Sequence, residues 1–384
     1  KNLFGKANLQ PVAAAMLTRG TKTMTRSEIE DRMTELKMAG SITNFTTTRK
    51  NLPAALELVF DAMHNSIMPQ DEFDQFKKQM QVMIESMRDK PDALAQNAIT
   101  QHFNTYPKGD PRYEYSLDES LEQLNKLTVD QVRAFYKEFG GTSRGEISIV
   151  GDFDPKAVEK IIRDDYAKYV SKAHYAPVVT EYRPVKATRV VIDTPDKENA
   201  IIVARSVFPI NDTAPDAPAL TVANWILGGG TGLSNRLIER LRQKDGLSYG
   251  AGSHVRIPAK GDNGSFVFRA IVAPQNMLQA EASARDVIAK AIKDGFTDQE
   301  VEEAKKGLLQ AMQVARSQDD VVARSWNDKM ENQRTWVFSK KQAEAISKLT
   351  TADVNAALRK YIKPDEITFV LAGDQKKAAQ KKQD

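Results

Sequence analysis

An arginine and a tyrosine seven residues apart are the side chains of this sequence best suited to chemistry on a peptide bond. Arg242 lies in a short basic helical pattern, and Tyr249 opens the strand pattern that follows a glycine turn. A guanidinium and a phenol that point into one cleft could together hydrogen-bond a peptide carbonyl or a developing oxyanion. The alternative is a solvated basic face, because Arg236, Arg240 and Lys244 share the helical pattern and cations favour helix C-termini.

A glycine cluster, Gly228-Gly-Gly-Thr-Gly232, precedes that helical pattern. It is not a phosphate-binding loop, because that loop requires Gly-Lys-Ser/Thr and here Leu233-Ser-Asn follows. Two interpretations stay open. The cluster is either a helix C-terminus that runs into a turn or a loop whose bare backbone lies against an extended ligand.

Two other classes of catalytic site are disfavoured by residue spacing. Gly246-Leu-Ser-Tyr-Gly250 has the G-x-S-x-G pattern of a nucleophile elbow, but the one later histidine, His254, follows within six residues and no carboxylate lies between. With no cysteine in the chain, a zinc site would have to rely on His and carboxylate ligands. The four histidines, His64, His102, His174 and His254, form no zinc-binding spacing.

Composition excludes further classes. The 384 residues include 55 Lys and Arg against 51 Asp and Glu, and the net charge of +4 gives no support for nucleic-acid binding. No apolar run approaches the roughly 20 residues that span a bilayer. A 41% hydrophobic content is that of a globular protein, and the length suits two domains.

An internal repeat indicates how these two domains are arranged. Lys126-Leu-Thr recurs as Lys348-Leu-Thr, each opening an amphipathic helix, and each helix is followed by a strand pattern that ends in Gly-Asp. A repeat of this size, 348 − 126 = 222 residues, indicates a duplicated domain. We predict a first domain over residues 1–172, a proline-punctuated linker over 173–187 and a second domain over 188–384.

Hydrophobic periodicity predicts an α+β fold in which each domain is a mostly antiparallel sheet covered on one face by helices. The predicted helices cover 26–37, 52–62, 70–87, 91–103, 129–138, 217–227, 275–294, 298–317 and 351–361. The predicted strands cover 41–48, 147–150, 188–194, 200–208, 248–256, 264–272 and 367–372. The first domain has no counterpart of the two strands that open the second. We therefore expect a chain that is a mature product or a fragment.

The segment from Leu227 to Gly250 closely resembles the pitrilysin/insulinase-type zinc metallopeptidases. In that family a glycine-rich turn, an S-x-R-L…L-R helix and a G-L-x-Y-G strand occur in this order. The duplicated layout and the Val-Gly-Asp-Phe-Asp-Pro155 strand end also fit.

The resemblance implies roles for individual residues. In single-chain members, four homologous domains form two halves that close around a peptide, and the last domain contributes an Arg and a Tyr seven apart. Arg242 and Tyr249 match that pair and are the predicted catalytic contributors. Gly228, Gly229 and Gly230 match the glycine-rich turn and are candidate substrate-binding residues.

The sequence departs from the family at the zinc motif. The positions of H-x-x-E-H fall on Pro11, Ala14 and Ala15, which carry no ligand atoms. Near the place of the distant ligand, Glu85 stands without zinc partners. The chain therefore resembles the non-metal half, with no metal of its own. Zinc would be bound by a zinc-bearing N-terminal half or by a partner subunit.

The resulting hypothesis is the non-metal half of a zinc metalloendopeptidase, inactive alone, which forms part of a peptide-enclosing chamber and contacts the peptide substrate. The alternative is a catalytically inactive scaffold or peptide-binding subunit of the same fold. The alanine- and lysine-rich style resembles that of periplasmic bacterial members. We expect a periplasmic location, with the cytoplasm left open.

Overall fold

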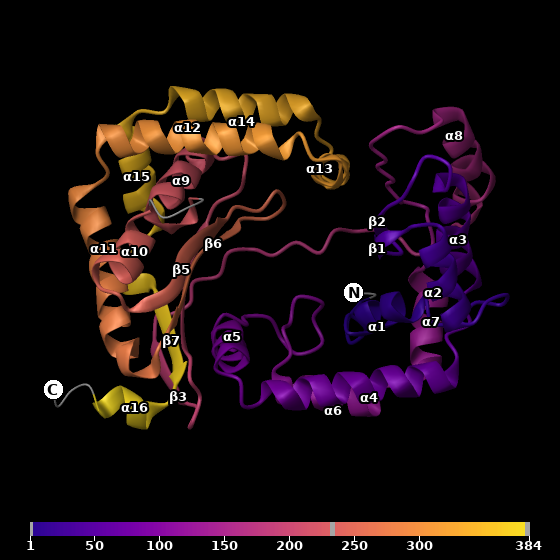
Figure 1. The fold of residues 1–384 in the computed structure, drawn as a ribbon, viewed down its shortest axis with the longest axis horizontal. Helices are drawn as coiled ribbons and strands as arrows, with labels where there is room; N and C mark the ends of the chain where they lie inside the picture. The colour runs from indigo at the N-terminus through magenta and orange to yellow at the C-terminus, as the bar shows by residue number, and fades with distance from the viewer. Residues whose placement is uncertain (1–2, 231–234, 381–384) are drawn as a thin grey trace.

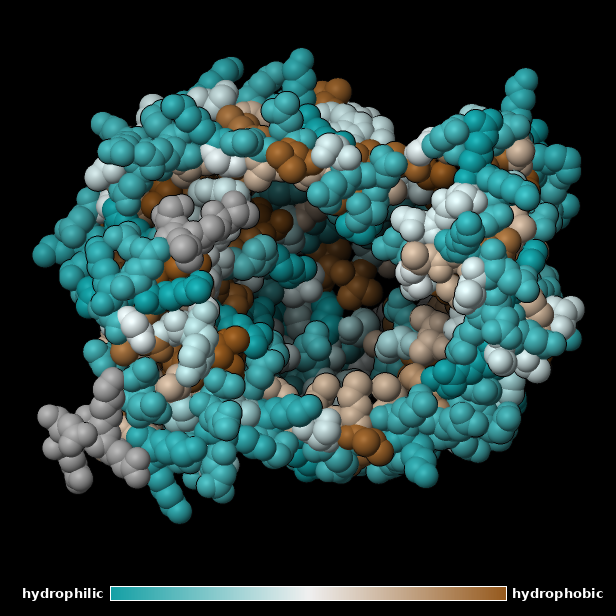
Figure 2. Space-filling model, viewed as in Figure 1, coloured by the Kyte–Doolittle hydropathy of each residue, from teal (hydrophilic) through white to brown (hydrophobic). Residues whose placement is uncertain are grey.

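The computed structural model describes residues 3–230 and 235–380. Two halves stand on either side of a hollow (Figures 1 and 2). The second half is built around a five-stranded sheet, and the first is mostly helical. Over the described ranges, no helix combines the length and the apolar character needed to cross a membrane.

The second-half sheet has the strand order β3-β7-β4-β6-β5. Every pairing is antiparallel except the parallel β3–β7 pair. The strands are β3 (Arg189–Asp193), β4 (Ala200–Pro209), β5 (Ser248–Arg256), β6 (Asn263–Val272) and β7 (Thr368–Gly373).

Helices cover one face of this sheet and enclose the main core. Phe266, Phe268 and Phe369 project from the sheet into that core and are almost fully buried. Because the core takes apolar residues from the sheet and from one stripe of each helix, the 3.6-residue periodicity located these helices well. The second-half helices are α9 (Ala217–Asn224), α10 (Arg236–Ile238), α11 (Met277–Asp294), α12 (Asp298–Ala315), α13 (Asp319–Glu331), α14 (Trp336–Lys348), α15 (Thr351–Tyr361) and α16 (Gln375–Gln380).

The first half repeats part of this order of elements. Helix α1 packs on α7 as α9 packs on α15, so the two copies of the Lys-Leu-Thr helix occupy equivalent places. The domain boundaries themselves stay a prediction. The first-half elements are α1 (Leu9–Met16), α2 (Arg26–Glu35), β1 (Ala39–Ser41), β2 (Asn44–Thr46), α3 (Leu52–Asn65), α4 (Gln70–Met87), α5 (Pro91–His102), α6 (Leu117–Lys126), α7 (Val129–Phe139) and α8 (Pro155–Asp164). Single 3₁₀ turns lie at Tyr166–Lys168, Pro274–Asn276 and Pro364–Glu366.

The α+β class, with an antiparallel-rich sheet and covering helices, is confirmed, but two predicted strands of the first half are wrong. Residues 147–150 are not paired into a strand within the described chain. The predicted strand 41–48 is instead divided by a turn: Ser41 ends β1 and Asn44–Thr46 form β2 of a short hairpin. Alternation of apolar and polar residues indicates which side chains are buried. A strand also requires backbone hydrogen bonds to a neighbouring strand, which this local pattern does not reveal. Ile149 does pack near Leu52 and Leu56, which explains the apolar pattern.

Helix α5 of the first half packs on the second-half sheet. It covers the face opposite the other helices, where Ala95 and Ile99 are buried against Ile201, Val203 and Val370 (Figure 1). The sheet of one half is therefore buried on both faces only with the help of the other half. This packing joins the two halves of the chain.

Because α5 packs on the second-half sheet, we predict that a side chain of α5 stabilises the second half. Ile99→Ala should remove about 2–5 kcal/mol of packing free energy by leaving a cavity between α5 and the sheet. All three tryptophans, Trp225, Trp326 and Trp336, lie in the second half. We therefore expect a lower urea midpoint in tryptophan fluorescence.

The matched control is Ile147→Ala, because that side chain is 40% exposed. It should shift the midpoint little. An unchanged fluorescence midpoint in Ile99→Ala would show that α5 does not support the sheet.

Candidate functional site

Two π-helical turns contain part of the predicted site: Gly228 and Gly229 lie in the first and Arg242 in the second. Trp225–Gly229 continues α9, and Glu239–Lys244 continues α10. Each ends in a backbone bond that spans five residues: the Gly230 amide donates to the Trp225 carbonyl at 3.0 Å, and the Asp245 amide to the Arg240 carbonyl at 2.9 Å. Such widened turns are rare and occur frequently at functional sites.

Two glycines at the end of the first π-helical turn allow a close approach to strand β5. A Cβ atom at Gly228 would lie 2.5 Å from the Ser253 hydroxyl, and one at Gly229 would lie 2.3 Å from the Asn224 amide nitrogen. Ser253 donates a hydrogen bond to Asn224 at 2.8 Å, which fixes this contact. Packing therefore accounts for both glycines, and Gly228 is buried.

Gly230 is partly exposed at the end of that turn. The substrate-binding role of the three glycines stays a prediction. Thr231 and Gly232, the rest of the predicted loop, lie outside the described residues.

Ion pairs separate the cations of the basic helix into two groups. Three of the four pair with carboxylates: Arg236 with Glu300 at 2.7 Å, Arg240 with Asp245 at 2.8 Å, and Lys244 with Glu239 at 2.9 Å. Arg242 is exposed, and no carboxylate of the described chain lies within ion-pair distance of it. The structure thus gives three of these cations a role in folding and leaves Arg242 without one.

The turn between Arg242 and Tyr249 is fixed by Asp245. Its carboxylate accepts hydrogen bonds from Arg240 at 2.8 Å and from the Ser283 hydroxyl at 2.7 Å. Burial works to raise the pKa of Asp245, but these two hydrogen bonds outweigh it and hold the pKa below its usual value. The Leu247 amide then donates to the Leu241 carbonyl at 2.8 Å and closes the turn.

Tyr249 lies at an irregularity at the start of β5. Ser248 and Gly250 pair with consecutive residues of β6, so Tyr249 is the additional residue of a β-bulge. Its side chain is 66% exposed. In the described chain no side chain or backbone group hydrogen-bonds its hydroxyl. Arg242 and Tyr249 thus both face solvent at the two ends of one fixed turn, and neither has a partner among residues 3–230 and 235–380.

The positions that correspond to the zinc motif have no metal ligands. Pro11 and Ala14 are exposed on α1, and Ala15 beside them is partly buried. Glu85 is engaged by Arg88 at 2.8 Å. Across the described residues, no group of three His, Asp or Glu side chains could hold a metal ion. This donor set does not fit zinc.

Replacing Asp245 should loosen the turn without unfolding the protein. Asn keeps the size of the side chain but removes its charge, which is worth about 1 kcal/mol for a partly exposed pair. We expect Asp245→Asn to lower the protection of the Leu247 amide from hydrogen exchange about fivefold.

Low pH should have the same effect on the wild type. Because the folded-state pKa of Asp245 is depressed, its stabilisation is present at neutral pH and disappears as the pH falls through that pKa. Exchange rates must be corrected for the intrinsic pH dependence. Asp164→Asn, which breaks the surface pair of Asp164 with Lys160, is the control. Unchanged Leu247 protection in Asp245→Asn would contradict the role of this carboxylate.

Comparisons with known proteins agree with the fold and the sequence pattern. An uncharacterized zinc protease of Mycobacterium tuberculosis is 24% identical over 299 residues, which cover 74% of this chain and 66% of the relative. Another from Streptomyces coelicolor is 24% identical over 277 residues, covering 70% and 58%. The non-peptidase homolog YmxG of Helicobacter pylori is 20% identical over 259 residues, covering 67% and 58%. The chain thus spans just under two thirds of these relatives, or less.

Solved structures share the fold. The peptidase M16 inactive domain from Pseudomonas fluorescens superimposes with a TM-score of 0.79 at 21% identity, over 94% of this chain and 87% of that one. The periplasmic protease PqqL from Escherichia coli gives a TM-score of 0.65 at 15% identity, over 95% of this chain and 41% of that one. Residues 126–308 match the family model described as the peptidase M16 inactive domain. The resemblance found in the sequence is thereby confirmed: residues 126–308 match the inactive domain of M16 peptidases, and the chain shares its fold with such domains.

Proposed function

We propose that this chain is the non-metal half of a zinc metalloendopeptidase and forms part of a chamber that encloses a peptide. The observation that carries the proposal is the pair Arg242 and Tyr249. Both are exposed and lack partners in the described chain, although the neighbouring cations are all paired. The hollow between the two halves (Figure 2) is consistent with a chamber wall.

The two side chains suit the charge change of peptide hydrolysis. As the scissile carbonyl becomes tetrahedral, negative charge develops on its oxygen. A guanidinium and a phenol can both donate hydrogen bonds to that oxygen, and such bonds strengthen as the charge develops. The fixed turn between them supplies the preorganisation that this stabilisation requires.

The metal chemistry belongs to another part of the enzyme. Zinc, held by a zinc-bearing N-terminal half or a partner subunit, would activate water and polarise the carbonyl. Relatives named zinc proteases support such a parent enzyme. This chain would contribute binding, orientation and oxyanion contacts only.

The alternative is an inactive scaffold or peptide-binding subunit. Two observations favour it. The zinc-motif positions on α1 carry no metal-ligating side chains, and one relative is named a non-peptidase homolog. Neither explains why Arg242 and Tyr249 stay unpaired and exposed. The peptidase half and the inactive scaffold differ in one testable respect: only in the peptidase half would Arg242 and Tyr249 affect the rate of peptide hydrolysis.

The isolated chain should neither bind zinc tightly nor cleave peptides. After incubation with zinc and dialysis, elemental analysis should find much less than one equivalent per chain, because the donor set is lacking. One retained equivalent per chain, or zinc-dependent cleavage of a peptide library, would overturn the assignment as the non-metal half.

In the complete enzyme, Tyr249→Phe should lower kcat about 100-fold and leave KM within about twofold, as expected for a lost oxyanion donor. Folding should be unaffected, since the hydroxyl has no partner within the described chain. Tyr175→Phe, at a tyrosine 44% exposed in the linker, is the matched control. An unchanged kcat in Tyr249→Phe would remove the phenol from the mechanism and favour the scaffold.

A further inference from the structure

Strand β4 carries an arginine whose position is unusual. Arg205 lies in the run Ala200–Phe208, which is otherwise apolar apart from Ser206. It is on the sheet face that α5 partly covers, in line with Ile201 and Val203. Its Nε atom is buried and has no hydrogen-bond partner in the part of the chain that the structure describes. A buried donor without a partner is unfavourable, so native proteins rarely keep one without a reason.

The groups around Arg205 do not neutralise its charge. The ring of Phe103, at the end of α5, lies 4.8 Å from the guanidinium carbon. The nearest influential charges are another cation, Arg256 on β5, and the carboxylate of Glu114, which is not within ion-pair distance. Burial, and then the repulsion from Arg256, lower the pKa of Arg205, while Glu114 opposes the shift.

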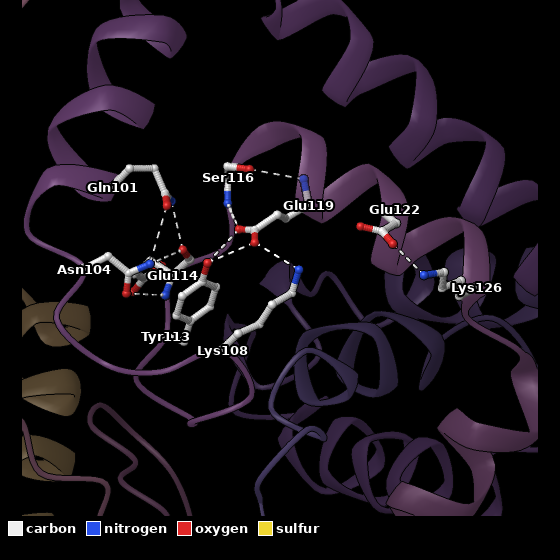
Figure 3. Close-up of polar contacts among 9 residues, drawn as sticks. All are labelled: Gln101, Asn104, Lys108, Tyr113, Glu114, Ser116, Glu119, Glu122 and Lys126. Atoms are coloured by element: carbon white, nitrogen blue, oxygen red, sulfur yellow. Dashed lines mark hydrogen bonds and ion pairs between the residues drawn. The ribbon is translucent and has the colours of Figure 1, made fainter.

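Glu114 is held by its backbone (Figure 3). Gln101 and Asn104 each donate a hydrogen bond to its carbonyl at 2.8 Å, and its amide donates to the Asn104 oxygen at 3.3 Å. These bonds fix the loop that follows α5. The Glu114 side chain is exposed and forms no ion pair with Arg205 among the described residues.

A neighbouring arginine on this face, in contrast, has a carboxylate partner. Arg269 of β6 lies on the same face and pairs with Asp92 of α5 at 2.6 Å. Arg205 and Arg256 have no such pair in the described residues. By strand register, Arg205 stands opposite Val267 of β6, which in turn pairs with His254 of β5. Arg256 is two residues farther along β5 than His254. Two cations thus share one stretch of sheet, and no carboxylate of the described chain forms an ion pair with either of them.

This stretch lies near the β5–β6 turn, which extends from the second half toward the hollow (Figure 1). Arg256 is exposed there, and Arg205 is partly buried. The planar guanidinium is the side chain best matched to a carboxylate, which it can bind through two parallel hydrogen bonds. An anion at this place would supply the missing acceptor and separate the two like charges.

We propose that Arg205 and Arg256 form a subsite that binds a carboxylate of the enclosed peptide. The subsite rests on the proposed chamber function and adds a substrate class to it, namely peptides with an acidic group. The carboxylate comes either from a peptide C-terminus or from an Asp or Glu side chain. Both sources have the same chemistry, and the test distinguishes them.

The test measures binding of three labelled peptides to the full chain by fluorescence anisotropy at low salt. The peptides share one neutral sequence: one is amidated, one has a free C-terminus, and one is amidated with a single internal Glu. We expect at least one acidic form to bind about tenfold tighter than the neutral peptide, as for a charge-assisted hydrogen bond. The tighter form identifies the source of the carboxylate.

Variants assign this discrimination to the two arginines. Arg205→Gln and Arg256→Gln should each reduce the tenfold preference to about twofold or less, whereas Arg269→Gln should keep it. Because Arg205 is partly buried, circular dichroism must show that its variant folds. Arg256 is exposed, so its variant tests the subsite even if the other unfolds. Equal binding of all three peptides by the wild type would overturn the subsite and leave the chamber function standing.

A second measurement separates failure of the subsite from failure of the chamber. The ¹⁵N resonance of the Arg205 Nε–H, assigned with Arg205→Gln or by backbone connectivity, is followed during titration with acetate and, separately, acetamide. A saturable shift with acetate alone supports the carboxylate site even if no peptide binds, in which case the chamber function fails. No shift with acetate overturns the subsite whatever the peptides do.

Discussion

Burial of both faces of one sheet is the constraint on which the structure depends. Helices of the second half cover one face, and α5 of the first half covers part of the other. A five-stranded sheet with one apolar face open to water would be unstable, so the position of α5 is not optional. After α5 the chain returns through α6 and α7, which pack on α4 and α1 of the first half. The hollow seen in Figure 2 is what remains between the parts that this joint holds together.

The predicted catalytic pair depends on a more local set of constraints. The π-helical turn at Glu239–Lys244 changes the direction in which its side chains project, and Asp245 fixes the turn that follows. The bulge at Tyr249 places one additional residue at the start of β5. Each feature departs from ideal geometry, and each is held by bonds to residues elsewhere in the second half. Departures of this kind are expected where a protein positions side chains for a ligand.

The sequence was sufficient where structure depends on local patterns. The helix at Gln70–Met87 and the strand at Ser248–Arg256 have the predicted bounds, because helical and two-residue periodicities are local signals. The pattern at 147–150 failed because a strand requires neighbours that the pattern does not contain. The spacing of Arg242 and Tyr249 was visible in the sequence. That Arg236 pairs with a residue 64 positions away, leaving Arg242 alone, was not.

The same limit applies to Arg205. Its signal in the sequence is an arginine within an apolar strand, which could have been noticed. Whether such a residue has a partner depends on the chain that folds over it, and only the structure shows that Asp92 reaches Arg269 instead. The π-helical turns gave no signal at all, because their composition is that of ordinary helices. Sequence patterns thus identified candidate functional residues, and the structure showed which of them are paired with other residues of the chain.

Helix α5 has a mechanical consequence. Pulling the two halves of this chain apart would expose Ile99 and the apolar face of β4 and β7 to water, a cost that an enzyme would incur at every turnover. In the proposed chamber, opening and closing would therefore take place at the joint between this chain and the proposed zinc-bearing half. During such motion the two halves of this chain would move together as one rigid body.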